Sequence, residues 1–326
     1  MLALSRLNYY RRIFSAYLTP QKSHLTFWHE TPEINDHFRP GVLGEYYMPF
    51  SAKADYSGEY DREGVPLLNY HGKIGLQYNP IAIAQYGLAN HRSFSRTGDL
   101  ERRRKFLAAA DWLVTNLEKN AQGMCVWNHH FDWEYRTLLK APWRSALAQG
   151  QGISILVRAY HHSKNPLYME TAKLAFEPFL MTIDKGGVSY IDERGDTWFE
   201  EYVVFPPTHI LNGFIWASWG VYDYFVATAE SAAERLFRQA IQTLSANIHR
   251  YDAGFWSLYE QSGTKLKMLA SPFYHHLHIV QLKILHQLTG EEIFRRYAEK
   301  WEGYRRNRLY QKFSLFHKGI FKLLYY

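Results

Sequence analysis

Two adjacent glutamates and a tyrosine, Glu200, Glu201 and Tyr202, stand shortly before a predicted apolar helix and are the side chains best suited to chemistry. Alternation along an extended strand sends Glu201 to the face opposite Glu200 and Tyr202. We expect Glu200 to lie on a solvated acidic turn and Glu201 to be the functional carboxylate. A single carboxylate that faces phenol groups suits proton transfer, whereas glycoside hydrolysis uses two carboxylates that flank the scissile bond.

Two more tyrosines take corresponding positions later in the chain. Tyr259 stands at the end of a predicted hairpin, and Tyr274 stands at the start of another apolar helix. If the helices form a ring, both tyrosines converge with Glu201 and Tyr202 at one opening. The pattern therefore predicts a proton-transfer site built from one carboxylate and several phenols.

Histidine and cysteine form no recognised metal or nucleophile motif in this sequence. His275 and His278 are three residues apart on a predicted helix, which is more typical of a hydrogen-bonded structural pair than of a metal site. The sequence has no HExxH, CxxC, GxSxG, P-loop or GxGxxG pattern, and Cys125 is the one cysteine. We expect no metal and no redox cofactor.

A repeat of about 64 residues must position these side chains. Pro80, Pro142, Pro206 and Pro272 follow one another at intervals of 62, 64 and 66 residues, and proline marks helix starts. Each proline precedes an apolar inner helix and then a more amphipathic outer helix, the latter predicted at 100–119, 166–177, 231–250 and 291–304. The predicted fold class is mainly α: an (α/α) toroid of four antiparallel helix pairs, with β-hairpins over one face.

One polar residue recurs near the start of each inner helix. Gln85, Gln149, Asn212 and His276 are separated by 64, 63 and 64 residues. A closed ring of helix pairs would point these four side chains toward one common mouth.

The connectors between the helix pairs read as β-structure, at 123–138, 187–202 and 251–264. Residues 1–70 fit no repeat, and we expect them to form an N-terminal appendage packed on the barrel, with a helix over Met1–Leu18. Residues 71–304 would form the catalytic toroid. Residues 305–326 would form a basic C-terminal tail.

Composition restricts the partners of the protein. A formal charge of +7 indicates an anionic partner, and 17% aromatic residues, many set among polar ones, suit a cleft that stacks sugar rings. No basic run interleaved with stacking aromatics matches a nucleic-acid motif, so we expect no nucleic acid. Apolar stretches are too short to span a bilayer, and Arg6, Arg11 and Arg12 interrupt any signal peptide. These features predict a soluble, cytoplasmic protein.

Several segments between residues 64 and 304 together resemble a known family. They include Tyr78-Asn-Pro-Ile-Ala-Ile-Ala-Gln-Tyr-Gly-Leu, Trp143-Arg-Ser-Ala-Leu-Ala-Gln-Gly-Gln-Gly, the run from Glu200 to Phe214, and Tyr274-His-His-Leu-His-Ile-Val-Gln-Leu. In this order they are similar to the D-glucuronyl C5-epimerase family, in a short form of bacterial type. The resemblance implies a similar toroid and conversion of D-glucuronate to L-iduronate within a heparosan-like, anionic uronate polysaccharide, without a cofactor.

The resemblance also implies roles for individual residues. Glu201 matches the catalytic glutamate of the family, and Tyr202 the tyrosine beside it. Tyr274 matches the tyrosine that works from the opposite face of the sugar, and Tyr259 a further active-site tyrosine. Asn212 matches an asparagine that contacts the substrate.

The predicted substrate-binding set is larger than this asparagine. Ser262 stands where the family usually has an arginine, so Arg144 is our candidate partner for the substrate carboxylate, with an ordinary surface arginine as the alternative. The remaining members of the set are Gln149, Tyr78, Gln85 and His278.

Three questions stay open at this point. A polysaccharide lyase would remove the same proton and then eliminate the C4 oxygen, and a catalytically inactive glycan-binding protein would do neither. The tail 305–326 is basic and aromatic-rich, so it either docks on the barrel with a solvated basic face or contacts an anionic membrane surface such as the inner membrane. Homodimerisation also stays open.

Overall fold

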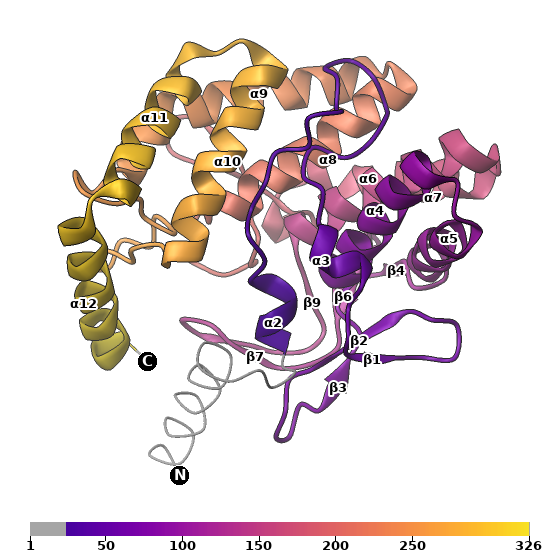
Figure 1. Cartoon of the computed structure of the whole chain (residues 1–326), viewed down its shortest axis with the longest axis horizontal. Helices are drawn as coiled ribbons and strands as arrows, with labels where there is room; N and C mark the ends of the chain where they lie inside the picture. The colour runs from indigo at the N-terminus through magenta and orange to yellow at the C-terminus, as the bar shows by residue number, and fades with distance from the viewer. Residues whose placement is uncertain (1–23, 326) are drawn as a thin grey trace.

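The computed structural model of this chain describes residues 24–325 and is dominated by paired helices. The expected helix over residues 1–18 lies outside the described residues. Four inner helices of 18 residues each are α4 (Pro80–Thr97), α6 (Ala146–Ser163), α8 (Leu211–Thr228) and α10 (Pro272–Thr289). Each is followed by an outer helix: α5 (Leu100–Thr115), α7 (Pro166–Phe176), α9 (Ser231–Asn247) and α11 (Glu292–Arg306). The prediction of four antiparallel helix pairs is confirmed (Figure 1).

Local capping sets the ends of the inner helices. The Asn79 side chain accepts hydrogen bonds from the first-turn amides of α4, and Pro80 fills the first helical position. Ser271 caps α10 in the same way, and both helices end at a glycine in the left-handed conformation, Gly98 and Gly290. The proline signal was therefore accurate for two helices, whereas α6 and α8 begin several residues after their prolines.

The inner helices are apolar on all sides because they lie between the outer helices and the centre of the molecule. Successive inner helices pack side by side, and α6 approaches α8 most closely. At this crossing Gly150 and Gly220 bring the two backbones together: a Cβ at Gly220 would lie 2.2 Å from the Gly150 carbonyl oxygen. The crossing can only form with glycine at these positions.

The N-terminal segment lies between the first and last inner helices (Figure 1). It holds α2 (His24–Trp28), α3 (Ser51–Ala54) and a three-stranded sheet of β1 (Glu59–Tyr60), β2 (Pro66–Asn69) and β3 (Leu76–Gln77). Tyr46 and Tyr47 are buried against Trp219 of α8, at ring distances of 6.0 and 5.1 Å. This segment therefore shares one core with the helix pairs.

The connectors form short strands that gather beside one end of the helices. The predicted hairpin at 187–202 is present as β10 (Ser189–Ile191) and β11 (Thr197–Phe199), with Gly195 in its turn at φ 83°. The first connector contributes β4 (Glu118–Lys119), β5 (Cys125–Val126), β6 (Asn128–His129), β7 (Trp133–Glu134), β8 (Leu138–Leu139) and β9 (Trp143–Arg144). The expected hairpin at 251–264 is wrong: Leu258 bridges Leu269, beyond that segment, so only isolated bridges form there.

One more helix, α12 (Arg308–Tyr325), follows α11 at the edge of the molecule. Among residues 24–325, no helix combines the length and apolar character needed to cross a bilayer.

The α6–α8 crossing gives a test of the fold. Gly220→Ala should lower the free energy of unfolding by about 3 kcal/mol or more, because the new methyl group meets backbone atoms that have no rotamer to move to. Gly303→Ala in α11 is the matched control: nothing lies within 4 Å of its Cβ, so it should raise the free energy of unfolding by about 0.5–1 kcal/mol. Urea denaturation compares the two, and equal stabilities would contradict the close crossing.

Candidate active site

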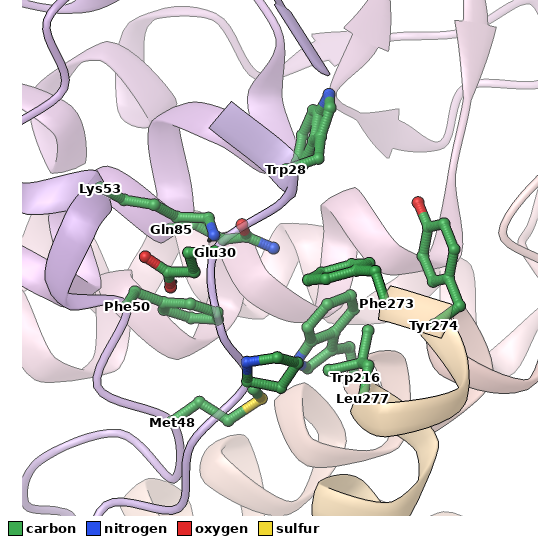
Figure 2. Close-up of a pocket in the computed structure, with 11 residues that line it drawn as sticks. Trp28, Glu30, Met48, Phe50, Lys53, Gln85, Trp216, Phe273, Tyr274 and Leu277 are labelled. Atoms are coloured by element: carbon green, nitrogen blue, oxygen red, sulfur yellow. Dashed lines mark ion pairs between the residues drawn. The ribbon is translucent and has the colours of Figure 1, made fainter. Parts of the chain in front are cut away.

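A cavity of about 130 Å³ opens where the starts of the inner helices meet the connectors and the N-terminal segment. α4 contributes Gln85, α8 Asn212 and α10 Tyr274, while Glu201 and Tyr202 enter from the segment after β11. A smaller hollow adjoins it and shares four lining residues with it, Trp28, Gln85, Trp216 and Tyr274. Figure 2 shows Gln85 and Tyr274 on different sides of this hollow.

The carboxyl group of Glu201 lies on the first turn of α8 and is 5% exposed. Asn212 donates its side-chain N–H to Glu201 Oε2 at 3.3 Å. A Cβ at Gly213 would come within 2.2 Å of the same oxygen, so glycine is what allows the carboxyl group to rest on the helix.

Burial raises the pKa of Glu201 to about 8. Hydrogen bonds from Tyr202 and Asn212 oppose this shift, and the nearby carboxylates of Glu260 and Glu200 add to it. The group is therefore largely protonated at neutral pH and still able to ionise close to it, which is the range in which a side chain both gives and takes protons.

The tyrosines gather around this carboxyl group. Tyr202 packs on Tyr135 with ring centres 4.6 Å apart, and Tyr274 meets Tyr259 edge-on at 4.9 Å. Tyr202 and Tyr274 line the cavity, whereas Tyr259 is buried behind Tyr274 and its pKa is raised well above the usual value by burial and by the Glu201 charge. The structure thus brings the four predicted catalytic side chains into one cluster.

The expectation for Glu200 is wrong. This residue is fully buried, and its carboxylate pairs with His209 Nδ1 at 2.6 Å and accepts the backbone N–H groups of Thr208 and His209. Strand alternation fails here because β11 ends at Phe199, so the three residues after it are not part of an extended strand. Consequently Glu201 and Tyr202 reach the same cavity.

Two of the six predicted substrate-binding residues line the cavity. Asn212 and Gln85 are both nearly fully buried, and the side-chain oxygen of each has no hydrogen-bond partner within the described part of the chain. The side-chain nitrogen of Asn212 donates to Glu201, and that of Gln85 donates to Gln151. Two residues that line the cavity thus each keep an unpaired acceptor among the described residues, which suits a ligand rich in hydroxyl groups.

Arg144 and Gln149 do not line the cavity, and we correct these two assignments. The Arg144 guanidinium donates to the carbonyl oxygens of Gly187 at 2.9 Å and Ile183 at 2.7 Å. Gln149 holds the first connector against α7, accepting from Trp127 N and donating to Ala175 O. Gln149 is the fourth residue of its helix and Gln85 the sixth, so their side chains differ by about 200° around the helix axis.

Tyr78 and His278 are also placed elsewhere. Tyr78 is on the surface, where its hydroxyl donates to Asp61 at 2.7 Å. His278 is buried next to Ser257, with Ser257 Oγ 3.0 Å from its Nδ1. The fourth residue of the repeat, His276, lines a different hollow. In residues 24–325 no three histidine, cysteine, aspartate or glutamate side chains are grouped as a metal site would need.

The aromatic wall of the cavity was not assigned residue by residue from the sequence. It consists of Trp28, Tyr70, Phe131, Trp133, Trp143 and Trp216. Aromatic faces of this kind pack on the apolar faces of sugar rings. The excess of aromatic residues predicted such a cleft. Trp28 lies outside the repeat, so the sequence pattern did not predict that it lines the cavity.

A sequence comparison now decides the family. The family described as D-glucuronyl C5-epimerase C-terminus matches residues 120–303, more than half of the chain. This chain belongs to the D-glucuronyl C5-epimerase family. The match covers Glu201, Tyr259 and Tyr274, together with most of the cavity wall that the connectors supply.

Two curated proteins are similar in sequence to this chain over part of their length. The D-glucuronyl C5-epimerase of Caenorhabditis elegans is 31% identical over 214 residues, which are 61% of this chain and 34% of that protein. An uncharacterised protein of Methanocaldococcus jannaschii, MJ1128, is 30% identical over 198 residues, which are 60% of this chain and 63% of that protein. The chain thus spans less than two thirds of either relative.

Two solved structures of glycan-processing enzymes are similar at a lower level. The unsaturated glucuronyl hydrolase of Bacillus sp. GL1 has a TM-score of 0.44 and 14% identity, with 68% of this chain and 60% of that chain covered. A polysaccharide lyase, BACCELL_00875, has a TM-score of 0.44 and 12% identity, with 84% and 66% covered.

The raised pKa of Glu201 predicts how stability depends on pH. Below pH 4.5 Glu201 is protonated in both the folded and the unfolded chain. Between pH 4.5 and about 8 it is protonated only in the folded chain. The free energy of unfolding therefore falls as pH rises through this interval. Glu201→Gln removes this effect. Its free energy of unfolding should match that of the wild type near pH 4.5 and exceed it by on the order of 2–4 kcal/mol at pH 8.5.

Urea denaturation at a series of pH values measures this difference. Glu193→Gln, at an exposed position of the β10–β11 turn, is the control and should follow the wild type at every pH. A Glu201→Gln difference that stays constant with pH would contradict the raised pKa.

Proposed function

We propose that this protein is a polysaccharide uronate C5-epimerase that converts D-glucuronate to L-iduronate residues in a heparosan-like polymer. The observation that carries the proposal is the placement of Glu201, a carboxyl group that titrates near neutrality, in one cavity with the phenol of Tyr274. The two groups come from different elements, the segment after β11 and the first turn of α10. Family membership supports the same reaction.

The reaction needs a base and an acid at the same carbon. Glu201 would take the hydrogen from C5 as a proton, leaving the electron pair delocalised over the adjacent carboxylate as an enediolate. Tyr274 would then return a proton from its hydroxyl group to the other face of C5, which inverts the carbon. The enzyme regains its starting state when Glu201 releases this proton to solvent and the Tyr274 phenolate takes a proton from solvent. No oxidation or reduction occurs.

The developing negative charge must be stabilised by hydrogen-bond donors. Among the described residues that line the cavity there is no lysine or arginine. The adjoining hollow has one, Lys53, whose Nζ lies 3.2 Å from Glu30 (Figure 2). We therefore propose that Tyr202 and the side-chain amide of Asn212 donate the hydrogen bonds that stabilise this charge, and that Arg144 does not. The protonated form of Glu201 also lets an anionic sugar enter without like-charge repulsion.

Recognition of the sugar would fall to the other walls. The oxygens of Gln85 and Asn212 would accept hydrogen bonds from sugar hydroxyl groups. Trp133 and Trp143 would stack on ring faces of the polymer.

Proton NMR of heparosan incubated with the protein in D₂O tests the reaction. We expect loss of the C5 proton signal, appearance of iduronate signals and no new ultraviolet absorbance. Glu201→Gln and Tyr274→Phe should each lower the exchange rate at least 10²–10⁴-fold, the usual range for a lost acid or base. Tyr297→Phe, on the outer helix α11, is the matched control and should retain the wild-type rate.

The other outcomes identify the alternatives. Unsaturated, ultraviolet-absorbing ends and shorter chains would show a lyase. Polymer binding without exchange at C5 would show a non-catalytic glycan-binding protein. Full activity in Glu201→Gln would overturn the assignment of the base.

The pH dependence of exchange tests which group is the base. Tyrosine has an unperturbed pKa near ~10, so its phenolate is scarce at neutral pH and Glu201 is the better base. With Glu201 ionising at about 8, kcat/KM for exchange should rise by about tenfold per pH unit below pH 8 and level off above it. Initial rates of C5 exchange from pH 5.5 to 9.5 measure this, and a rate that falls through pH 8 would make Glu201 the acid.

A further inference from the structure

The last described helix, α12, carries a stripe of exposed large apolar side chains. Leu309, Phe313, Phe316, Ile320 and Leu324 are 75%, 52%, 66%, 36% and 66% exposed. Their spacing of four, three, four and four residues places them on one face of the helix. Scattered exposed apolar residues are ordinary on protein surfaces, but a continuous row of five along a helix marks an interaction surface.

The helix is held by the fold with this stripe facing outward. Ser314 and Phe321 are buried on another side of α12. The ring of Phe255, from the connector after α9, lies 4.9 Å from the Phe313 ring and 6.2 Å from that of Tyr310. Docking of the tail on the barrel, one of the two sequence-based expectations, therefore takes place. It covers part of Phe313 and leaves the rest of the stripe exposed.

The charge of this segment indicates what covers the stripe. Residues 307–326 contain Arg308, Lys312, Lys318 and Lys322 and no aspartate or glutamate. A second copy of α12 laid on the stripe would add further cations and would supply no acidic partner for Lys312 and Arg308, which lie nearest to the stripe on the helix. An anionic polysaccharide would neutralise these cations but would leave the leucine and isoleucine side chains in water. An anionic lipid surface satisfies both kinds of group, with acyl chains for the stripe and headgroups for Lys312 and Arg308 on its flank.

We propose that α12 attaches the protein to an anionic lipid bilayer by lying in the interface with its apolar stripe toward the acyl chains. A helix of this kind is amphipathic, basic and only moderately hydrophobic, so it binds the surface without crossing it. The attachment is independent of the proposed epimerase reaction, because none of the described side chains of α12 lines the catalytic cavity.

Vesicle flotation with the full chain tests the proposal. The protein should float with phosphatidylcholine vesicles that contain 30% phosphatidylglycerol and stay behind with pure phosphatidylcholine vesicles. Binding should weaken at least fivefold at 0.5 M salt, because the electrostatic part is screened over a few ångströms there. Equal binding to both kinds of vesicle, or none to either, would overturn the proposal.

Matched variants distinguish vesicle binding through the stripe from non-specific binding through other exposed apolar residues. The triple variant Leu309→Ser, Phe316→Ser, Leu324→Ser changes the three most exposed members of the stripe and should lose at least tenfold in vesicle affinity. The control Leu100→Ser, Leu138→Ser, Leu180→Ser removes three exposed leucines outside α12 and should bind as the wild type does. Arg308→Gln with Lys312→Gln should lose the preference for anionic vesicles.

Two further readouts complete the test. Circular dichroism and the C5 exchange rate on soluble polymer should be unchanged in the stripe variant, so a failed exchange assay would concern the proposed function and not the membrane contact. Sedimentation velocity reports the oligomeric state. A dimer that dissociates in the stripe variant would show that a second copy covers α12 and would overturn the lipid assignment.

Discussion

The contact between the Glu201 carboxyl group and the first turn of α8 is the constraint on which the site depends. The carboxyl group needs glycine at position 213 and an amide donor at Asn212 to fit there. Burial in this position raises the pKa of Glu201 to about 8, which costs stability at and above neutral pH and makes proton exchange easy in the same range. Burial of the Glu201 carboxyl group is thus the common origin of its suitability for proton transfer and of the loss of stability at higher pH.

A buried ion pair fixes the other elements around that contact. Arg158 of α6 pairs with Asp223 of α8 at 2.7 Å, and both are 1% exposed. The guanidinium also donates to Gly44 O and Ser154 O, and Tyr47 donates its hydroxyl to the same aspartate at 2.6 Å. Full hydrogen bonding offsets the cost of removing both charges from water. The pair ties two inner helices to the N-terminal segment, which in turn forms part of the cavity wall through Trp28.

Three buried glutamates lie close together near the cavity, and each has a different partner. Glu200 is held by His209, and Glu260 accepts the hydroxyl of Tyr135, whereas Glu201 has the neutral hydrogen-bond partners Tyr202 and Asn212. Burial raises the pKa of both Glu260 and Glu201, and Glu201 is the one of the three glutamates that lines the cavity. The adjacent residue Glu200 has a structural role, although the sequence presents the two as equivalent.

The sequence by itself determined the helix pairs, because apolar periodicity and the capping residues Asn79 and Ser271 act locally. It also indicated the cluster of Glu201 and Tyr274. Only the tertiary structure decided which side chains meet in the cavity. The rotation of each inner helix about its axis depends on packing such as the Gly150 crossing, so a residue spacing near 64 does not keep side chains on one face. The ends of strands and the path of segments outside the repeat are set by contacts that are distant in sequence, and local patterns do not encode these.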